Sequence, residues 1–410
     1  MKRRLLFLIL LVMLVSIAMS LSACKGEAEI PDNRKLSVVD SKIVNAIGEE
    51  IYIRGVNAGG YLIQEGWMCP TTSNGQNIID QKTMISVLEQ RFDEQQVKNL
   101  LNAYESNWWT EEDFDNIKAS GLNTIRLPFW YMNLEDSEGE ITNFSRLDWF
   151  IDKCDERDLY VILDLHGAYG SQNGKDHSGD TSGINLFDSE ENRSKTINLW
   201  VEISSRYKER NIVAGYDLLN EPEGNAGTTG PIQWVFYREV CQAIRDNGDE
   251  HIIFLEGVWE ANSMPNPEEV FPFSNIVYEF HEYNWPISNL GTEEGLTLHQ
   301  EFVDTKINNY QEEDFQIPII IGEFNVFSNI PAWEYTLSEY EKEGIGWIFW
   351  TYKVKNHESN WGLYYGTQEL EEADVSLDSY DEILRKWSLL KTSESFILND
   401  TLAGLIDSSK

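Results

Sequence analysis

The sequence has few cysteines and few basic residues for its length. After Cys24, only Cys69, Cys154 and Cys241 remain among 410 residues, and no two of them stand at metal-site spacing. One disulfide among the three is possible, and their spacing does not choose it; Cys154 and Cys241 fit buried helix positions. Lys and Arg number 32 against 69 Asp and Glu, which makes the net charge −37. So acidic a chain is unsuited to nucleic acid and to anionic polymers, and a neutral partner fits it better.

A second long apolar run is also missing, since the only one is Leu5 to Leu21, behind Lys2, Arg3 and Arg4. This pattern predicts an export signal, and an ordinary signal peptide or an N-terminal membrane helix are the alternatives. The run closes on L-S-A-C, which resembles a bacterial lipobox with Cys24 as the lipid-bearing residue. We therefore expect a lipoprotein signal peptide at 1–23, a tether at 24–36 and one domain at 37–410. Such a protein would be extracytoplasmic, lipid-anchored at the cell surface or in the periplasm, and we expect it to be a monomer.

Several catalytic motifs are absent as well. No G-x-G-x-x-G follows the first strand candidate, so a dinucleotide site is not indicated. The six His include no H-E-x-x-H, and no G-x-S-x-G is present, which argues against zinc and serine chemistry. We predict no cofactor and no metal. The alternative is a divalent-metal site built from Asp164, His166 and Glu221, because the first two share one face of a strand.

What the sequence does contain is a regular alternation of strand and helix patterns. Eight short, nearly continuous apolar runs begin near residues 51, 124, 161, 214, 252, 276, 319 and 346. Such runs are typical of parallel strands buried on both faces. Helical spacing occurs between most of them, as from 197 to 207, and also at 111–120, 145–158, 231–247, 299–311 and 331–343. This order predicts a single (β/α)8 barrel, with an open doubly wound sheet as the alternative.

One segment does not follow the alternation. Residues 61–110 form a long insertion after the first strand and hold three Trp, at 67, 108 and 109. Loops of this length commonly carry function or cover a site. A closing helix is expected at 378–391, and the pattern after Lys391 assigns no element.

Polar residues gather where the predicted strands end. In a barrel of this kind, those ends meet at one mouth, which is where active sites are built. The residues read from the strand ends are Asn57, Arg126, His166, Asn220, Glu221, Glu256, His281, Tyr283, Glu323 and Trp350.

Two of these residues form a candidate catalytic pair. Glu221 ends the fourth strand and Glu323 the seventh, and barrel closure would bring them together. Two carboxyl groups in different environments are what glycoside hydrolysis requires: a neutral acid and an anionic nucleophile. A nearby Arg126 and a hydrogen bond from Tyr283 would keep Glu323 ionised, whereas Glu221 has no evident cation and suits a raised pKa. A retaining mechanism would place the two carboxyl groups about 5–5.5 Å apart.

The same residues carry a resemblance to retaining glycoside hydrolase family 5, a family of (β/α)8 hydrolases. The resemblance covers most of residues 50–366 in strand order. Its motifs are R-L-P-F (126–129), L-D-L-H-G (163–167), L-L-N-E-P (218–222), E-F-H-E-Y (279–283), I-I-G-E-F (320–324) and W-I-F-W-T-Y (347–352).

The resemblance implies roles for the residues of these motifs. Glu221 would be the acid/base and Glu323 the nucleophile, with no cofactor. Asn220 would bind the sugar 2-hydroxyl, and Arg126 and Tyr283 would orient and ionise Glu323. The subsite for the cleaved sugar would be lined by His166 and His281, with Trp350 as its stacking floor.

A narrower resemblance points to the exo-β-1,3-glucanases of this family. It rests on G-G-Y-L-I-Q-E-G-W (59–67) and H-G-A-Y-G-S-Q-N-G-K-D-H-S-G (166–179). It implies that Glu65 and Asp176 bind outer hydroxyls of a terminal sugar. The sequence departs from that pattern in segment 68–110, at Lys175, where those enzymes tend to have an aromatic residue, and at His177, where they tend to have Asn.

The predicted function is a retaining β-glucan hydrolase, exo-β-1,3-glucanase-like or β-glucosidase-like, acting through a covalent intermediate. Alternatives are an endo-β-1,4-glucanase or a β-mannanase of the same family, and a non-catalytic glycan-binding surface lipoprotein.

Overall fold

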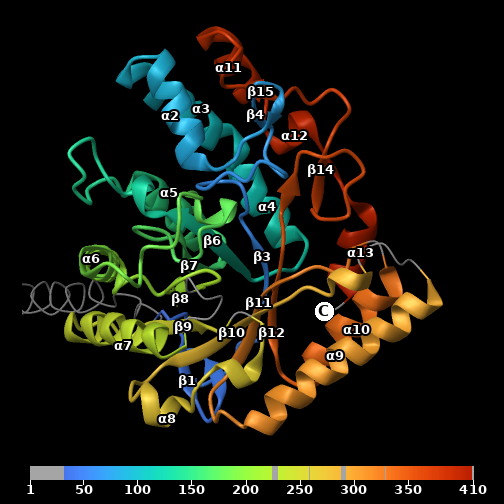
Figure 1. The fold of residues 1–410 in the computed structure, drawn as a ribbon. Helices are drawn as coiled ribbons and strands as arrows, with labels where there is room; N and C mark the ends of the chain where they lie inside the picture. The colour runs from blue at the N-terminus through green and yellow to red at the C-terminus, as the bar shows by residue number, and fades with distance from the viewer. Residues whose placement is uncertain (1–31, 224–229, 258, 288–291, 328, 409–410) are drawn as a thin grey trace, which may run out of the picture. The chain divides into compact units, whose positions relative to one another are not determined.

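The computed structural model describes residues 32–223, 230–257, 259–287, 292–327 and 329–408. Residues 34–410 form one compact unit around a closed barrel of eight parallel strands (Figure 1). Each strand pairs with the next along the chain, and the last pairs with the first, which confirms the predicted (β/α)8 barrel. The barrel strands are β3 (Arg54–Asn57), β6 (Thr124–Trp130), β7 (Tyr160–Gly167), β8 (Val213–Asp217), β9 (Ile252–Glu256), β10 (Ile276–Glu282), β11 (Ile319–Phe324) and β12 (Gly346–Phe349).

Helices cover the outside of the barrel. They are α4 (Glu111–Ala119), α5 (Ser145–Asp155), α6 (Glu190–Tyr207), α7 (Gly230–Asp246), α8 (Pro267–Val270), α9 (Glu293–Glu313) and α10 (Ile330–Lys342). Most agree closely with the predicted ranges. Two helices begin earlier than predicted. The helix α6 begins at Glu190 and not near 197, because the Ser189 side chain accepts the Asn192 N–H, and α9 begins six residues before 299, because the Thr292 side chain accepts the Gly295 N–H. Short 3-10 turns η1 (Tyr131–Asn133), η2 (Asp176–Ser178), η3 (Ala261–Ser263) and η4 (Trp285–Ile287) lie in the loops.

The interior of the barrel is apolar at its amino end. Inward-facing Ile53, Ile162 and Ile348 pack together there. A hairpin of β1 (Ser37–Val39) and β2 (Lys42–Val44) adds Leu36 and Ile43 to this cluster and so closes that end. With the amino end filled, only the carboxyl ends of the strands are left to form a site.

The predicted insertion after the first strand is present and has its own secondary structure. It contains β4 (Thr71–Ser73), β5 (Gln76–Asn77), α2 (Gln81–Arg91) and α3 (Glu94–Trp108). Asp80 and Asp93 cap the two helices by accepting backbone N–H groups. Two of its Trp residues, Trp108 and Trp109, are buried in the core, so much of the insertion is structural.

The C-terminal segment packs against this insertion. The predicted closing helix is α11 (Tyr380–Trp387), which lies beside α3 (Figure 1). The strand β15 (Ala373–Asp374) pairs with β4. Residues after Lys391, unassigned from sequence, form α12 (Thr392–Ser395), β16 (Phe396–Leu398) and α13 (Asp400–Ser408), and β16 joins β13 (Lys353–Val354) and β14 (Tyr364–Gly366) in a small sheet.

The structure tests only some of the sequence predictions about the N-terminal segment and the cysteines. The signal segment and Cys24 lie outside the described residues. The proposed tether, 24–36, is described only from residue 32, and Leu36 is already fully buried, so the folded unit begins before residue 37. Cys69, Cys154 and Cys241 are unpaired and buried, the latter two in α5 and α7 as predicted.

No helix within the described ranges is both long enough and apolar enough to cross a membrane.

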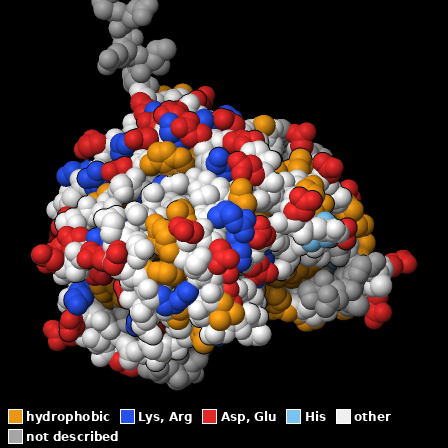
Figure 2. Space-filling view, turned by 90° about the horizontal axis from the view of Figure 1, so that it is seen from above, with side chains coloured by type: hydrophobic (Ala, Val, Ile, Leu, Met, Phe, Trp, Pro, Cys, Tyr) orange, Lys and Arg blue, Asp and Glu red, His pale blue; other side chains and the backbone are white. Residues whose placement is uncertain are grey.

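The acidic composition is distributed over the surface. Figure 2 shows acidic side chains spread across one face and interspersed with basic ones. This distribution suits a solvated surface.

Candidate active site

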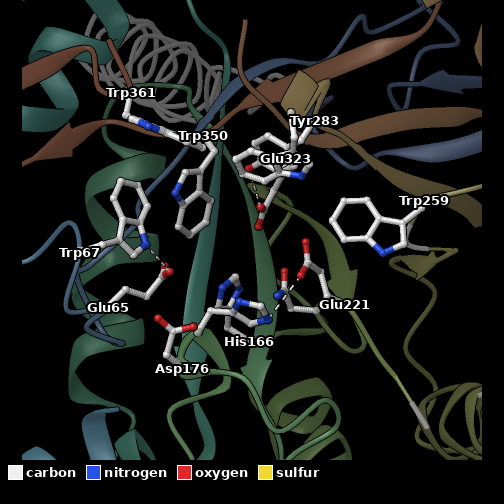
Figure 3. A pocket seen from close by; sticks show the side chains of 13 residues that line it. Glu65, Trp67, His166, Asp176, Glu221, Trp259, Tyr283, Glu323, Trp350 and Trp361 are labelled. Atoms are coloured by element: carbon white, nitrogen blue, oxygen red, sulfur yellow. Dashed lines mark hydrogen bonds and ion pairs between the residues drawn. The ribbon is translucent and has the colours of Figure 1, made fainter. Parts of the chain in front are cut away.

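A pocket of about 420 Å³ opens at the carboxyl ends of the barrel strands (Figure 3). Residues that are far apart in the sequence line this pocket. The lining residues that the sequence predicted for the site are Glu65, His166, Asp176, Asn220, Glu221, Tyr283, Glu323 and Trp350. The lining residues that it did not predict are Trp67, His177, Trp259, Trp285 and Trp361. Arg126 and His281 do not line the pocket. They lie beneath it and contact its carboxylates, which corrects the expectation that His281 lines the sugar subsite.

Arg126 organises the floor of the pocket. It projects from β6, is fully buried, and donates through Nη1 to Glu323 Oε1 at 2.9 Å, the contact that the sequence predicted. Through Nη2 it donates to Asn220 Oδ1, also at 2.9 Å. Because this bond occupies the amide oxygen, it turns the Nδ2 of Asn220 into the donor available to a ligand in the pocket.

Glu323 stands near the end of β11 in a strongly polar setting. The hydroxyl of Tyr283 donates to its Oε2 at 2.9 Å, as predicted. Burial raises the pKa of Glu323 to about 7, against the opposing effects of His281 and Arg126. The hydrogen-bonding partners of this carboxyl could be predicted from the sequence motifs, whereas its burial could not.

The Glu221 carboxyl has different neighbours from those of Glu323. The sequence predicted that Glu221 ends the fourth strand, but β8 already ends at Asp217, so Glu221 lies in the loop that follows, with a φ of 42° in the left-handed region. Its backbone N–H donates to the carboxylate of Glu256. The Nδ1 of His281 lies 2.9 Å from its Oε1, and the Nε2 of His177 lies 3.4 Å from its Oε2. Burial raises the pKa of Glu221, in the predicted direction.

The two carboxyl groups are close. One oxygen of Glu221, one of Glu323 and a nitrogen of His281 all lie within 4.8 Å of one another. Two buried carboxyls at this distance do not readily ionise together. The cation Arg126 contacts Glu323, so the negative charge is better placed there and the proton on Glu221.

Below the pair lies a group of acids that the sequence analysis did not single out as a set. Arg126 also forms ion pairs with Asp164, Asp217 and Glu279, at 3.0, 2.7 and 3.1 Å. Burial raises the pKa of each of these three carboxyls to about 7. Asp164 also lies 2.6 Å from His166 Nδ1, so it is engaged below the pocket and not in the alternative metal set with Glu221.

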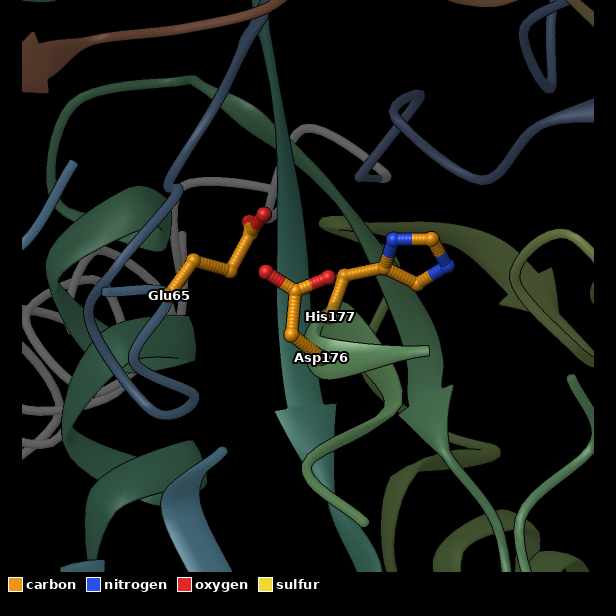
Figure 4. A group of neighbouring side chains, drawn as sticks. All are labelled: Glu65, Asp176 and His177. Carbon is orange, nitrogen blue, oxygen red and sulfur yellow. The ribbon is translucent and has the colours of Figure 1, made fainter. Parts of the chain in front are cut away.

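On the other side of the pocket, Glu65 and Asp176 point toward one another (Figures 3 and 4). The indole of Trp67 donates to Glu65 Oε2 at 2.7 Å, while Glu65 Oε1 is buried without a hydrogen-bond partner among the described residues. Burial, and then the Asp176 carboxylate, raise the pKa of Glu65 well above its usual range. An unpartnered oxygen of this kind suits a hydroxyl donor in the pocket.

Two groups in the described chain have the composition of a metal site. They are Glu65 with Asp176 and His177, and Glu221 with His281 and Glu323. In the first, a ring nitrogen of His177 lies within 4.8 Å of an oxygen of Glu65 and of Asp176, and its Nε2 lies 3.4 Å from Glu221 Oε2 (Figure 4). In the second, a cation would compete with Arg126 for Glu323.

Aromatic rings supply the remaining walls. Trp350 is parallel to the His166 ring, with centroids 5.5 Å apart and planes at 11°, and it faces the pocket as predicted. Trp259 and Trp285 follow directly after β9 and β10, so attention to residues just past each strand end would have found them. Trp361 lies between β13 and β14, well past the last barrel strand along the sequence, so the sequence carries no comparable signal for it.

A closed barrel with two facing glutamates at its mouth defines a class of (β/α)8 proteins with a paired-carboxylate site. The family model described as Cellulase (glycosyl hydrolase family 5) matches residues 89–356. The chain therefore belongs to glycosyl hydrolase family 5, as its motifs predicted.

Curated relatives and solved structures agree with this placement. A glucan 1,3-beta-glucosidase of Blumeria graminis is 34% identical over 244 residues, covering 56% of this chain and 55% of that protein. A beta-xylosidase of Phanerodontia chrysosporium is 31% identical over 255 residues, covering 61% and 52%. The chain thus spans about half the length of these two relatives. The structure of rutinosidase from Aspergillus niger has a TM-score of 0.61 at 17% identity, covering 82% of this chain and 98% of that chain. The structure of endoglucanase Cel5A from Thermotoga maritima has a TM-score of 0.52 at 19% identity, covering 86% of this chain and 96% of that chain. At these identities, both comparisons show the fold alone.

Proposed function

We propose that this protein is a retaining β-glycoside hydrolase that acts on β-glucan. The observation that carries the proposal is the pair of buried glutamates at the barrel mouth, with an oxygen of each within 4.8 Å and with unlike surroundings. Carboxyl groups with oxygens this near one another suit direct attack by one carboxylate, as in a retaining enzyme.

The reaction proceeds in two steps. In the first, Glu323 attacks the anomeric carbon, the glycosidic C–O bond breaks, and the proton of Glu221 moves to the departing oxygen. In the second, water attacks the same carbon, gives its proton to Glu221 and releases Glu323. Asn220 donates through Nδ2 to a sugar hydroxyl, and Trp350 supports the apolar face of the ring.

The far wall of the pocket supports removal of terminal sugars. Glu65 and Asp176 face one another there, away from Glu221 (Figure 3). Their oxygens can receive the hydroxyls of a sugar that has no further residue attached, and they narrow the space for a continuing chain. We therefore favour an exo-acting enzyme on β-1,3-linked glucan, in keeping with the names of the glucan 1,3-beta-glucosidase relatives.

Product analysis tests this assignment. The purified full chain is incubated with laminarin, carboxymethyl cellulose and galactomannan, and product sizes and the first-formed anomer are recorded by chromatography and NMR. We expect glucose from laminarin, initially in the β configuration. Shortened chains without monosaccharide would indicate endo action, an initial α product would refute retention, and no turnover on any β-glycan would refute the proposal.

We also propose that the chain is exported and held by a lipid on Cys24. The support is the positive segment, the apolar run and the L-S-A-C sequence that follows. Mass spectrometry of the mature N-terminus should find a lipid-modified Cys24, and the Cys24→Ala variant should leave the membrane fraction. An unmodified Cys24 in a mature chain would contradict the anchor.

A further inference from the structure

The two helices of the long insertion do not line the pocket, yet the start of α2 contacts both of the loops that carry its far wall. Glu65 lies in the loop after β3, and Asp176 lies in the loop after β7. These two acids form the wall at which the proposed function places a terminal sugar. The start of α2, residues 80–82, therefore bears on the position of that wall.

Gln81 holds the loop that carries Glu65. Its side chain is buried, and its amide oxygen accepts the Gln64 backbone N–H at 2.5 Å. Its Nε2 donates to the Leu62 backbone carbonyl at 3.2 Å. Because both partners are backbone groups, they determine the orientation of the amide and use both of its ends. Gln64 directly precedes Glu65, so Gln81 fixes the backbone from which the Glu65 side chain extends.

Asp80 holds the loop that carries Asp176. It is buried and caps α2, with its Oδ1 accepting the Thr83 N–H at 2.6 Å. Its Oδ2 accepts the Thr181 backbone N–H at 2.9 Å and also the Thr181 hydroxyl. Burial opposes ionisation, but the hydrogen bonds from Thr181 and Thr83 hold the pKa of Asp80 below its usual value. One oxygen of this carboxylate thus caps the helix, and the other binds the loop.

Lys82 adds two contacts to the same loop. Its backbone N–H donates to the Gly179 carbonyl at 3.0 Å, and its ammonium lies 2.6 Å from Asp180 Oδ2. The Gly179 N–H in turn donates to the Asp176 carbonyl at 2.9 Å and closes the η2 turn. The loop is therefore attached to α2 at three consecutive residues, 179–181, directly after the turn that carries Asp176.

The other end of α2 is anchored away from the pocket. Arg91, in its last turn, donates to the backbone carbonyls of Val375 and Asp378. The ring of Phe92 meets that of Tyr380 edge-on, with centroids 5.9 Å apart. These partners belong to the C-terminal segment, so α2 has an attachment that does not depend on the two loops.

We propose that Asp80 and Gln81 are positioning residues that hold Glu65 and Asp176 at the spacing that receives one terminal sugar. The proposal rests on the proposed function, because it assigns this wall to substrate binding. The two loops follow β3 and β7, which β6 separates in the barrel, so strand pairing does not bring the loops together directly. The start of α2 forms hydrogen bonds with both loops and so sets the distance between them.

The kinetic test replaces Asp80 with Ser in the full chain. A serine hydroxyl can still accept the Thr83 N–H and cap α2, but it has no second oxygen for Thr181. We expect KM for laminaritriose to rise by about threefold to tenfold, with kcat changed by less than about twofold, the scale of one or two hydrogen bonds. Asp93→Ser is the matched control and should leave both constants unchanged, because Asp93 caps α3 in the same way and bonds to neither loop within the described ranges.

A double variant separates positioning from a general loss of structure. If Asp80 acts through Asp176, adding Asp80→Ser to Asp176→Asn should raise KM little beyond the value for Asp176→Asn alone, because the positioned side chain has already been altered. Increases in KM that multiply would show that Asp80 acts independently of Asp176 and would overturn the proposal. An unchanged KM in Asp80→Ser, or a fall in kcat alone, would also overturn it.

Hydrogen exchange in the substrate-free chain gives an answer without turnover. We expect Asp80→Ser to speed exchange at Thr181 and in the loop after β7, with the barrel strands unchanged, and Asp93→Ser to exchange as the wild type does. Unchanged exchange in that loop would refute the attachment. If Asp80→Ser does not fold, Lys82→Met removes only the ion pair with Asp180, and it should raise KM and loop exchange by smaller factors. If exchange rises as expected and the wild type cleaves no β-glycan, the attachment stands and the proposed function fails.

Discussion

The two glutamates at the barrel mouth have the same side chain and unlike surroundings. Glu323 stands on β11, where Arg126 and Tyr283 both donate to its carboxylate. Glu221 stands in the loop after β8 with a positive φ, and its neighbours are two histidines. A cation and a hydroxyl donor in contact favour the anion, whereas burial favours the neutral carboxylic acid at Glu221. The difference shows how position alone can give one residue type two different protonation preferences.

Glu323→Gln should have the largest effect. The amide keeps the shape of the side chain and cannot form the glycosyl ester, so turnover should fall by roughly 10⁴-fold or more, the scale seen when a covalent nucleophile is removed. Initial rates on laminarin measure this. The exposed Glu369→Gln is the matched control and should retain normal rates. Near-normal activity of the Glu323 variant would refute its role as nucleophile.

Glu221→Ala should have the second largest effect, and it should depend on the leaving group. Loss of general acid catalysis costs roughly 10²- to 10⁴-fold. The first step should slow most for natural glucans and least for aryl glycosides whose leaving groups are stable anions. Burst kinetics with a dinitrophenyl glycoside would reveal an intermediate that accumulates because the base is missing. An equal loss with all leaving groups would contradict the assignment.

Tyr283→Phe tests the surroundings of Glu323 and not the carboxyl itself. Without the hydroxyl donor, the ionised form of Glu323 loses a hydrogen bond and its pKa rises further. The nucleophile must be ionised, so activity falls as the pH drops below the pKa of Glu323. Because that pKa is higher in the variant, the loss of activity begins at a higher pH. The acidic limb of kcat/KM should therefore move to higher pH, with about a tenfold loss of rate. A downward shift of that limb would show that the hydroxyl does not stabilise the anion.

The smallest effect is expected from Glu65→Gln, the same chemical change as in the first variant. Because burial and Asp176 raise the pKa of Glu65, a neutral amide is a fair mimic of its protonated carboxyl. We expect KM for laminari-oligosaccharides to rise by about threefold to tenfold, with little change in kcat. Steady-state kinetics separate the two constants, and a large loss in kcat would mean that Glu65 takes part in the reaction.

Much of the fold was predictable because buried parallel strands have a distinctive composition. Each of the eight apolar runs became a barrel strand, and the strand-end rule placed Glu221, Glu323 and Tyr283 at one mouth. The same rule misplaced Arg126, which it assigned to a strand end. This residue lies early in β6 and not at its end, so it supports the pocket from below.

The interior of the insertion and the acidic floor were not predictable in the same way. The helix α3 packs against α11, which lies near the other end of the chain, and no local sequence pattern indicates that contact. Asp217 and Glu279 look like ordinary strand residues until barrel closure directs both at Arg126.

The sequence by itself determined the barrel, the family and the identity of the two glutamates, because these depend on strand order and on residue types at strand ends. Only the tertiary structure decided the separation of the two carboxyls, the burial that raises both of their pKa values, and the contacts of His177 and His281 with Glu221. These properties arise from distances and desolvation between segments that lie far apart along the chain, and such interactions exist only once the barrel has closed.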